Sequence, residues 1–335
     1  MATSDMTPRE LGTADRSRKI AETAWEHGEA EAAQMLGITV ATVKRSIRRT
    51  KKVDADPEPL ISESRAKRQA LLGRIGEKFT DKELSLLARG STPPVNHVTP
   101  IHDFTGEIVR IGVLTDTHLG SKYTNPEYLL EAFDQFDEIG VDMVVHAGDV
   151  TEGLSHRPGH MYECTHVGYE AQKRHAIEAL SQWDQSPFYM ISGNHDRWYI
   201  KSAGAHIVKD ICEAIPNAEF LGDDEGDIWL NDKTNVRLWH GEDGSSYAHS
   251  YRLQKVIESF TGGDKPSMLI AGHVHKALYA FDRHVHCISA GCIQRQSKWM
   301  RGKRLPSHTG FWIVEMVVNE KGISRVRPEF FPFYV

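Results

Sequence analysis

The stretch Gly193-Asn194-His195-Asp196 is the point around which this chain of 335 residues is organised. It follows Phe188-Tyr189-Met190-Ile191, a short apolar run whose aromatic and branched side chains predict a buried strand. Open α/β sheets place their sites at the carboxyl ends of their strands. A strand that ends in Gly and three polar residues is therefore expected to deliver side chains to a cleft.

Four other apolar runs end in Asp or His in the same way. They are Val109 to Leu114 before Asp116-Thr117-His118, Met143 to Ala147 before Gly148-Asp149, Val236 to Trp239 before His240-Gly241, and Met268 to Ala271 before Gly272-His273-Val274-His275. Any one of these histidines, taken alone, is explained as a satisfied polar residue at a strand end. The ordered set of five blocks is much more specific.

These five blocks resemble the calcineurin-like metallophosphoesterase superfamily, over about Glu107 to Val335. The resemblance implies an α/β fold, a four-layer αββα sandwich with two divalent ions. One ion would be held by Asp116, His118, Asp149 and His275. The other would be held by Asp149, Asn194, His240 and His273, with Asp149 as the bridge. Mixed imidazole and oxygen ligands suit manganese, iron, zinc or nickel better than calcium, and the resemblance favours Mn²⁺.

The resemblance also implies two catalytic residues. His195 would lie over the leaving-group oxygen as a general acid or cationic stabiliser, and Glu152 would be the carboxylate that orients it. Asp196 is expected to accept hydrogen bonds from nearby backbone. The phosphoprotein phosphatases of the superfamily carry Arg immediately after the partner carboxylate and Glu at the end of the central block. This chain has Gly153 and Asp196 there, which favours the phosphodiesterase and nuclease branches.

The amino-terminal residues predict a small all-helical module that resembles a helix-turn-helix. Helices are expected over Arg16–His27, Glu29–Leu36 and Val40–Arg49, with a tight turn at Gly37. Ile20, Ala21, Ala24 and Trp25 are expected to share one face of the first helix. The outer face of the third helix carries Thr42, Lys44, Arg45, Arg48 and Arg49. Such a basic face suits phosphate neutralisation, so nucleic acid is the expected partner, DNA in preference to RNA. The alternative is a protein-binding module whose basic face is merely solvated.

Composition shifts predict three parts of the chain: residues 14–52 as the helix-turn-helix module, 53–104 as a linker with two short helices, and 105–335 as the metallophosphoesterase domain. The linker helices are expected over Ser62–Phe79 and Asp81–Arg89. In the third part the clearest helices are expected over Glu127–Ile139 and Gly168–Trp183. The loop from Ser155 to His166, which holds Arg157 and His160, is expected to shape the substrate. A basic loop from Arg295 to Arg304 surrounds Trp299 and suits a nucleic-acid backbone with a stacked base, or else is an ordinary solvated loop.

The overall composition predicts a cytoplasmic protein. Its four cysteines form no Cys-x-x-Cys pair and are expected to be reduced. The first residues lack the apolar core of a signal peptide, and no run approaches the ~20 apolar residues of a membrane span. The net charge of −6 gives no general attraction to nucleic acid, so any such attraction must be local. The sequence does not predict an oligomeric state.

The predicted function is hydrolysis of phosphodiesters in nucleic acid by a two-metal enzyme that its amino-terminal module targets to DNA. Two alternatives remain open. One is a phosphomonoesterase acting on phosphoproteins or small molecules. The other is a DNA-binding regulator with a vestigial phosphoesterase fold, although a protein without activity has no chemical need for the complete ligand set.

Overall fold

The computed structural model describes residues 13–37, 40, 43–44, 46–47, 97–98, 103–242, 248, 250–261 and 263–334. The chain divides into two units, Met1–Gly90 and Ser91–Val335. No helix in these ranges has the length and apolar character needed to cross a membrane.

The second unit is built on two six-stranded sheets. In one sheet the order is β12-β11-β2-β3-β4-β5, and β2 to β5 run parallel. Its strands are β2 Ile108–Leu114, β3 Met143–His146, β4 Phe188–Ile191, β5 Ala218–Gly222, β11 Gly310–Asn319 and β12 Gly322–Pro332. In the other sheet the order is β1-β6-β7-β8-β10-β9. Its strands are β1 His97–Val98, β6 Glu225–Asn231, β7 Thr234–Trp239, β8 Met268–Ala271, β9 Ala277–Asp282 and β10 Val285–Ala290.

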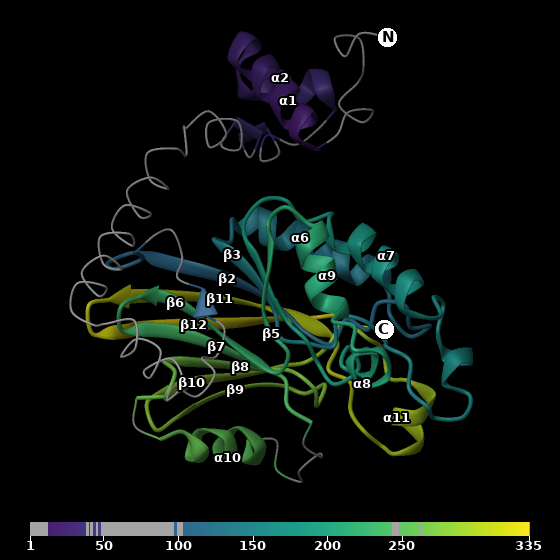
Figure 1. The fold of residues 1–335 in the computed structure, drawn as a ribbon. Helices are drawn as coiled ribbons and strands as arrows, with labels where there is room; N and C mark the ends of the chain where they lie inside the picture. The colour runs from purple at the N-terminus through teal and green to yellow at the C-terminus, as the bar shows by residue number, and fades with distance from the viewer. Residues whose placement is uncertain are drawn as a thin grey trace, which may run out of the picture. The chain divides into compact units, whose positions relative to one another are not determined.

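Helices cover the outer face of each sheet (Figure 1). The first sheet packs against α6 Pro126–Ile139, α7 Tyr169–Leu180 and α9 Ile207–Ala214, and the second packs against α10 Tyr251–Ser259. Two short helices, α8 Trp198–Ala203 and α11 Lys298–Gly302, and the 3₁₀ turn His160–Glu163 lie in connecting segments. The four layers, helix, sheet, sheet and helix, confirm the predicted fold class.

The period of two along β2 explains how the layers assemble. Val109, Ile111 and Val113 are fully buried between the two sheets, because alternate side chains of a strand point to the same face. Gly112, which lies between Ile111 and Val113, faces α6. A Cβ atom on Gly112 would lie 2.9 Å from the ring of Phe136. The missing side chain lets α6 lie close against the sheet.

The sheet that contains β6 begins earlier in the chain than predicted. His97 and Val98, which fall inside the predicted linker 53–104, form β1 and pair in parallel with β6. A two-residue edge strand has no room for an apolar period, so its sequence carried no strand signal. The predicted helices Ser62–Phe79 and Asp81–Arg89 lie outside the described residues.

The first unit contains α1 Thr13–His27 and α2 Glu29–Leu36, and residues 40, 43–44 and 46–47 are helical. Gly37 ends α2 in the left-handed conformation, with φ 63°, and its N–H donates to the carbonyls of Ala33 and Gln34. Ile20, Ala32 and Val43 are among the residues of its small apolar core.

One expectation about the first unit is wrong. Trp25 was expected on the inner face of the first helix with Ile20 and Ala24, but it is 52% exposed. The described core of this unit is formed without it, by Ile20, Ala24, Ala32, Ala33 and Val43, with Leu36 and Ile47 packed against them.

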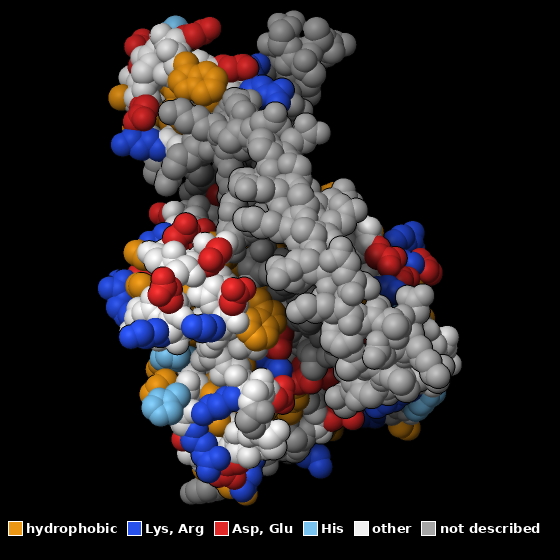
Figure 2. Space-filling view, turned by 60° about the vertical axis from the view of Figure 1, so that its left-hand side comes forward, with side chains coloured by type: hydrophobic (Ala, Val, Ile, Leu, Met, Phe, Trp, Pro, Cys, Tyr) orange, Lys and Arg blue, Asp and Glu red, His pale blue; other side chains and the backbone are white. Residues whose placement is uncertain are grey.

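Charged side chains of both signs are interspersed over the described part of the face in Figure 2. This mixture agrees with the modest net charge of −6.

Candidate metal centre and active site

The carboxyl ends of β2, β3, β4, β7 and β8 bring the seven predicted metal ligands together. Three groups of side chains each place one ligating atom within 4.8 Å of the others. These groups are Asp116 with His118 and His275, Asp149 with His240 and His273, and His118 with Asp149 and His195. The seventh predicted ligand, Asn194, places its Oδ1 2.8 Å from Nδ1 of His273 and 3.1 Å from Nε2 of His240.

The backbone at this site is strained in a consistent way. Five of the predicted ligands have positive φ values, between 46° and 79°: Asp116, His118, Asp149, His273 and His275. Such residues cost free energy on the order of 1–3 kcal/mol each and are found where the surroundings over-determine them. The strain turns each side chain inward from the end of its strand, toward a common centre.

Two glycines of the motifs are needed because segments approach closely. A Cβ atom on Gly193 would lie 2.2 Å from the backbone nitrogen and Oδ1 of Asp149. A Cβ atom on Gly148, which has φ 91°, would lie 2.5 Å from Nδ1 of His240. The glycines therefore allow three strand ends to converge on one carboxylate.

Hydrogen bonds hold the ligands in position. His240 donates from Nδ1 to the carbonyl of Ala147 at 2.7 Å, which leaves its Nε2 3.2 Å from Oδ2 of Asp149. Asp116 accepts from Oγ1 of Thr115 at 2.6 Å and from the backbone N–H of His273 at 2.9 Å. Outer contacts of this kind fix the tautomer and the orientation of ligating side chains.

The chemistry of the donor set fits divalent cations. Nε2 of His118 lies 3.3 Å from Nε2 of His275, and the latter lies 3.1 Å from Oδ1 of Asp116. Two imidazole nitrogens that face each other beside a buried carboxylate are a suitable arrangement of lone pairs for a cation. Oδ2 of Asp149 lies 3.7 Å from Nε2 of His118 and 3.2 Å from Nε2 of His240, so one carboxylate oxygen faces both groups, as suits a bridging ligand. Imidazole, carboxylate and amide donors suit divalent transition metals.

Electrostatics in this cluster balance buried carboxylates against imidazoles. Burial alone would raise the pKa of Asp149, but His240 and His195 hold that pKa far below its usual value. Burial alone would lower the pKa of His118, but hydrogen bonds with Asp116 and Glu152 raise that pKa well above its usual value. The cluster is thus a buried centre of ionised carboxylates that requires positive charge.

The partner of His195 differs from the predicted one. Nδ1 of His195 donates to the backbone carbonyl of Glu152 at 2.8 Å, and not to its carboxylate. Burial lowers the pKa of His195, so the neutral imidazole carries its proton on Nδ1 and turns Nε2 toward the site. The Glu152 carboxylate instead lies 3.1 Å from Nδ1 of His118, a predicted ligand. Glu152 is therefore a positioning residue for the metal centre.

Two further side chains hold that carboxylate. Nε2 of His160 lies 2.9 Å from Oε1 of Glu152, and Nε2 of Gln294 lies 3.0 Å from Oε2. His160 was expected among loop residues that shape the substrate, but it is 1% exposed. Gln294 carried no sequence signal, because it comes from the segment between β10 and α11 and reaches Glu152 only in the folded chain.

Gly153 has a structural reason to be glycine. Its φ is 67°, and a Cβ atom would lie 2.3 Å from the carbonyl oxygen of His195. Its backbone is clamped by Gln172, which accepts from its N–H at 2.8 Å and donates to its carbonyl at 3.0 Å. An arginine at this position cannot be accommodated without a shift of the backbone.

A cavity of about 500 Å³ opens over the metal centre. Trp198 and Trp299 contribute to its walls, and His195 lines it. Arg157 also lines the cavity, and both of its terminal nitrogens bond to Glu163, at 2.8 and 3.2 Å. Asp196 does not reach the cavity. As expected, it accepts from the backbone around it, including the N–H of Gly193 at 2.9 Å.

The predicted nucleic-acid contacts are described in part. Lys44 is helical, exposed and 3.6 Å from a carboxylate oxygen of Glu29. The other four predicted contacts, Thr42, Arg45, Arg48 and Arg49, lie outside the described residues.

Comparisons with known proteins identify a family. The model of the calcineurin-like phosphoesterase family matches residues 109–277, half of the chain. A solved archaeal phosphodiesterase is 20% identical and has a TM-score of 0.38, with 67% of this chain and 100% of that one covered. A phosphoesterase from E. coli is 16% identical with a TM-score of 0.36, covering 65% and 98%. A putative 5′-nucleotidase from Staphylococcus aureus is 13% identical with a TM-score of 0.39, covering 68% and 54%. No curated protein sequence matches the chain.

The chain belongs to the calcineurin-like phosphoesterase family. It is a metal-dependent phosphoric ester hydrolase, and its clusters of carboxylate and imidazole ligands are suited to divalent metal ions.

Proposed function

We propose that this enzyme is a phosphodiesterase that cleaves nucleic acid, with manganese as its metal, and that its amino-terminal unit binds DNA. Bound divalent ions would supply an activated water and neutralise charge on the phosphate oxygens. When His195 carries a second proton at Nε2, it would give that proton to the leaving oxygen, while the Glu152 carbonyl holds its Nδ1–H. Glu152 would keep His118 in place.

The ion pair between Arg157 and Glu163 is the observation that supports a preference for diesters. A phosphomonoester has one more negative charge than a diester and needs a free cation to hold it. Among the described residues that line the cavity, the lysine and arginine cations are Arg157 and Lys276. Glu163 already neutralises Arg157 through two hydrogen bonds, and Lys276 is buried and has an interaction partner. Gly153 leaves no space for a second arginine at the neighbouring position.

The rival function, a phosphomonoesterase, also rests on Arg157. Its side chain is 39% exposed at the edge of the cavity, and exposed ion pairs contribute little free energy. A substrate with a terminal phosphate would compete with Glu163 for the guanidinium group. The two functions therefore differ in whether Arg157 leaves Glu163.

We expect bis-p-nitrophenyl phosphate to be hydrolysed faster than p-nitrophenyl phosphate at the same manganese concentration. The ratio of the two kcat/KM values measures this preference, and single- and double-stranded DNA extend it to polymers. Asp149→Asn protein, purified in parallel, corrects for contaminating phosphatases. A preference for p-nitrophenyl phosphate or for a phosphopeptide would favour the monoesterase and contradict the proposal.

The proposed role of the amino-terminal unit is supported by its turn and by its core. Gly37 makes a tight turn after α2, and Ala32 and Ala33 are buried where the helices meet. Small side chains at such a crossing let helices approach closely, as a helix-turn-helix requires. Lys44 is exposed on the helical segment that follows.

Charge reversal on that segment should weaken binding to duplex DNA. In full-length protein, Lys44→Glu combined with Arg48→Glu removes two predicted phosphate-binding cations. The slope of log affinity against log salt should fall by about 0.9 for each phosphate that is no longer neutralised, which a fluorescence titration at several salt concentrations measures. Lys209→Glu, an exposed change on α9, is the matched control. An unchanged affinity and slope in the double variant would contradict this assignment.

A further inference from the structure

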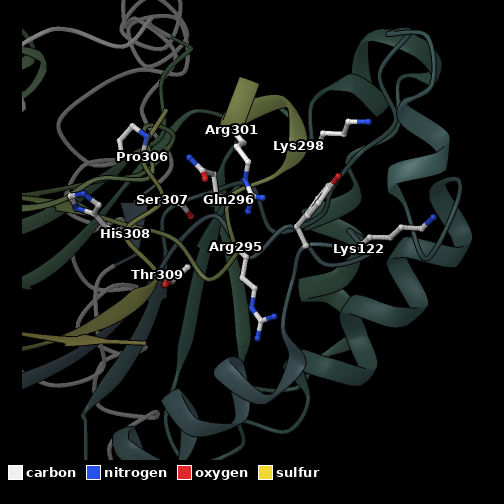
Figure 3. A pocket seen from close by; sticks show the side chains of 10 residues that line it. Lys122, Arg295, Gln296, Lys298, Arg301, Pro306, Ser307, His308 and Thr309 are labelled. Carbon is white, nitrogen blue, oxygen red and sulfur yellow. The ribbon is translucent and has the colours of Figure 1, made fainter. Parts of the chain in front are cut away.

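A second cavity, of about 730 Å³, lies beside the active-site cavity. Figure 3 shows its lining, with Lys298 and Arg301 coming from α11 and Lys122 from the segment that follows β2. Arg295 also contributes its side chain. The remaining described residues of the wall are uncharged or histidine, and none of them is acidic.

No carboxylate of the described residues neutralises the cations of this cavity. Lys122, Arg295, Lys298 and Arg301 are exposed, and within the described ranges no carboxylate lies within 4.0 Å of their charged atoms. Arg295 is held over the ring of Tyr128, with its guanidinium 5.3 Å from the ring centroid. Four like charges around one cavity repel each other, and an anionic ligand would relieve that repulsion.

Other arginines near the sheets form ion pairs with carboxylates. Arg157 is paired with Glu163, Arg197 with Asp224, and Arg237 with Asp227. In a chain with a net charge of −6, carboxylates are not scarce. The absence of acidic side chains from the lining of this one described cavity is therefore a feature that points to an anion.

Helix α11 separates this cavity from the metal centre. Trp299 and Met300 line the active-site cavity, while Lys298 and Arg301 line the basic one, and Pro306 contributes to both walls. Trp299 is 49% exposed. A ligand that passes around α11 would thus meet the metal centre, an exposed indole and a group of cations in succession.

We propose that this basic cavity holds non-scissile phosphates of a single nucleic-acid strand whose scissile phosphate lies at the metal centre. The inference rests on the proposed function and adds to it a subsite for the polymer. Trp299 would stack on a base between the two phosphate positions, since cationic grooves with interleaved aromatics bind single strands. A small diester has no second phosphate and would not use this subsite.

The test is the full-length double variant Lys298→Glu with Arg301→Glu, assayed with a single-stranded oligonucleotide and with bis-p-nitrophenyl phosphate. KM for the oligonucleotide should rise by about tenfold or more, and the loss should be at least tenfold larger than with the small diester. The salt slope for oligonucleotide binding should fall by about 0.7 for each phosphate that is no longer neutralised. Lys303→Glu reverses one positive charge in the same segment but lines neither cavity, and it should behave as the unmodified protein does.

The outcomes separate the two proposals. If the unmodified enzyme cleaves small diesters but no oligonucleotide, the nucleic-acid function fails and this subsite fails with it. If it cleaves the oligonucleotide and the double variant has the same KM and salt slope, only the subsite is overturned. If Lys303→Glu loses as much as the double variant, the effect is one of general charge and the cavity is not the binding site. A loss confined to a phosphopeptide substrate would assign the cavity to a protein partner and overturn the proposal.

Discussion

Replacing Asp149 by asparagine (Asp149→Asn) is expected to lower kcat by ~10³-fold or more and to reduce the bound divalent metal by at least one ion per chain. The carboxylate has Oδ2 3.2 Å from Nε2 of His240 and Oδ1 2.8 Å from the backbone nitrogen of His195. A neutral amide retains an oxygen for the backbone N–H but bridges two cations poorly. Hydrolysis rates and elemental analysis of the dialysed protein measure the two effects.

The control for this variant lies at the opposite end of the same strand. Asp142 precedes β3, while Asp149 follows it, and Asp142 accepts from the backbone N–H of Arg110 at 2.9 Å. Asp142→Asn makes the same chemical change at the opposite end of the strand and should retain activity and metal. Circular dichroism should show that both variants are folded. Full activity and an unchanged metal content in Asp149→Asn would rule out the bridging assignment.

Replacing His195 by alanine (His195→Ala) is expected to lower kcat by ~10²-fold or more while both metals stay bound. The side chain lines the cavity and is anchored through Nδ1 to the carbonyl of Glu152, so Nε2 is the nitrogen available to a substrate. Because the leaving group needs its proton only during bond cleavage, kcat should fall more than KM rises. A leaving group of low pKa, such as p-nitrophenolate, should reduce the defect relative to an alkyl ester.

The metal content decides between two roles for His195, because it also forms a close group with His118 and Asp149. A variant that loses metal together with activity would identify His195 as a ligand and contradict its role in proton transfer. His206→Ala, which removes a partly exposed imidazole paired with Asp223, is the matched control and should retain the full rate.

Many of the elements could be predicted from the sequence because their signals are local. The strand Phe188–Ile191 was predicted with the bounds of β4, and Glu29–Leu36 with those of α2. The helix expected over Glu127–Ile139 begins one residue earlier, at Pro126, where the Asn125 side chain accepts from the N–H of Glu127. Apolar period and capping chemistry act within a few residues of chain, and a sequence displays both.

Elements without such signals were not predicted. The edge strand β1 is only two residues long, and α11 has five residues of which Met300 is the buried one. Their conformation depends on neighbours far away in the chain, such as β6 for β1. A period cannot be read from so few residues, so only the folded chain defines them.

The candidate site likewise has features that the sequence predicted and features that it did not. The predicted ligands at the strand ends, among them Asp116, Asn194 and His273, do come together, although their role as ligands stays a prediction. The type and order of ligands are written in the sequence because each is attached to the end of its own strand. The contacts of the Glu152 carboxylate cannot be predicted from the sequence, because His118, His160 and Gln294 reach it from three separate segments.

The sequence by itself determined the class of chemistry, because ordered strand ends that carry Asp, Asn and His require no knowledge of distances. Only the tertiary structure decided which atoms meet. It showed that the backbone carbonyl of Glu152, and not its carboxylate, holds His195. It showed that Gly153 is closed to any side chain, and that α11 places cations on one side and Trp299 on the other. These features depend on the packing of segments distant in the chain, and packing is a property of the whole fold.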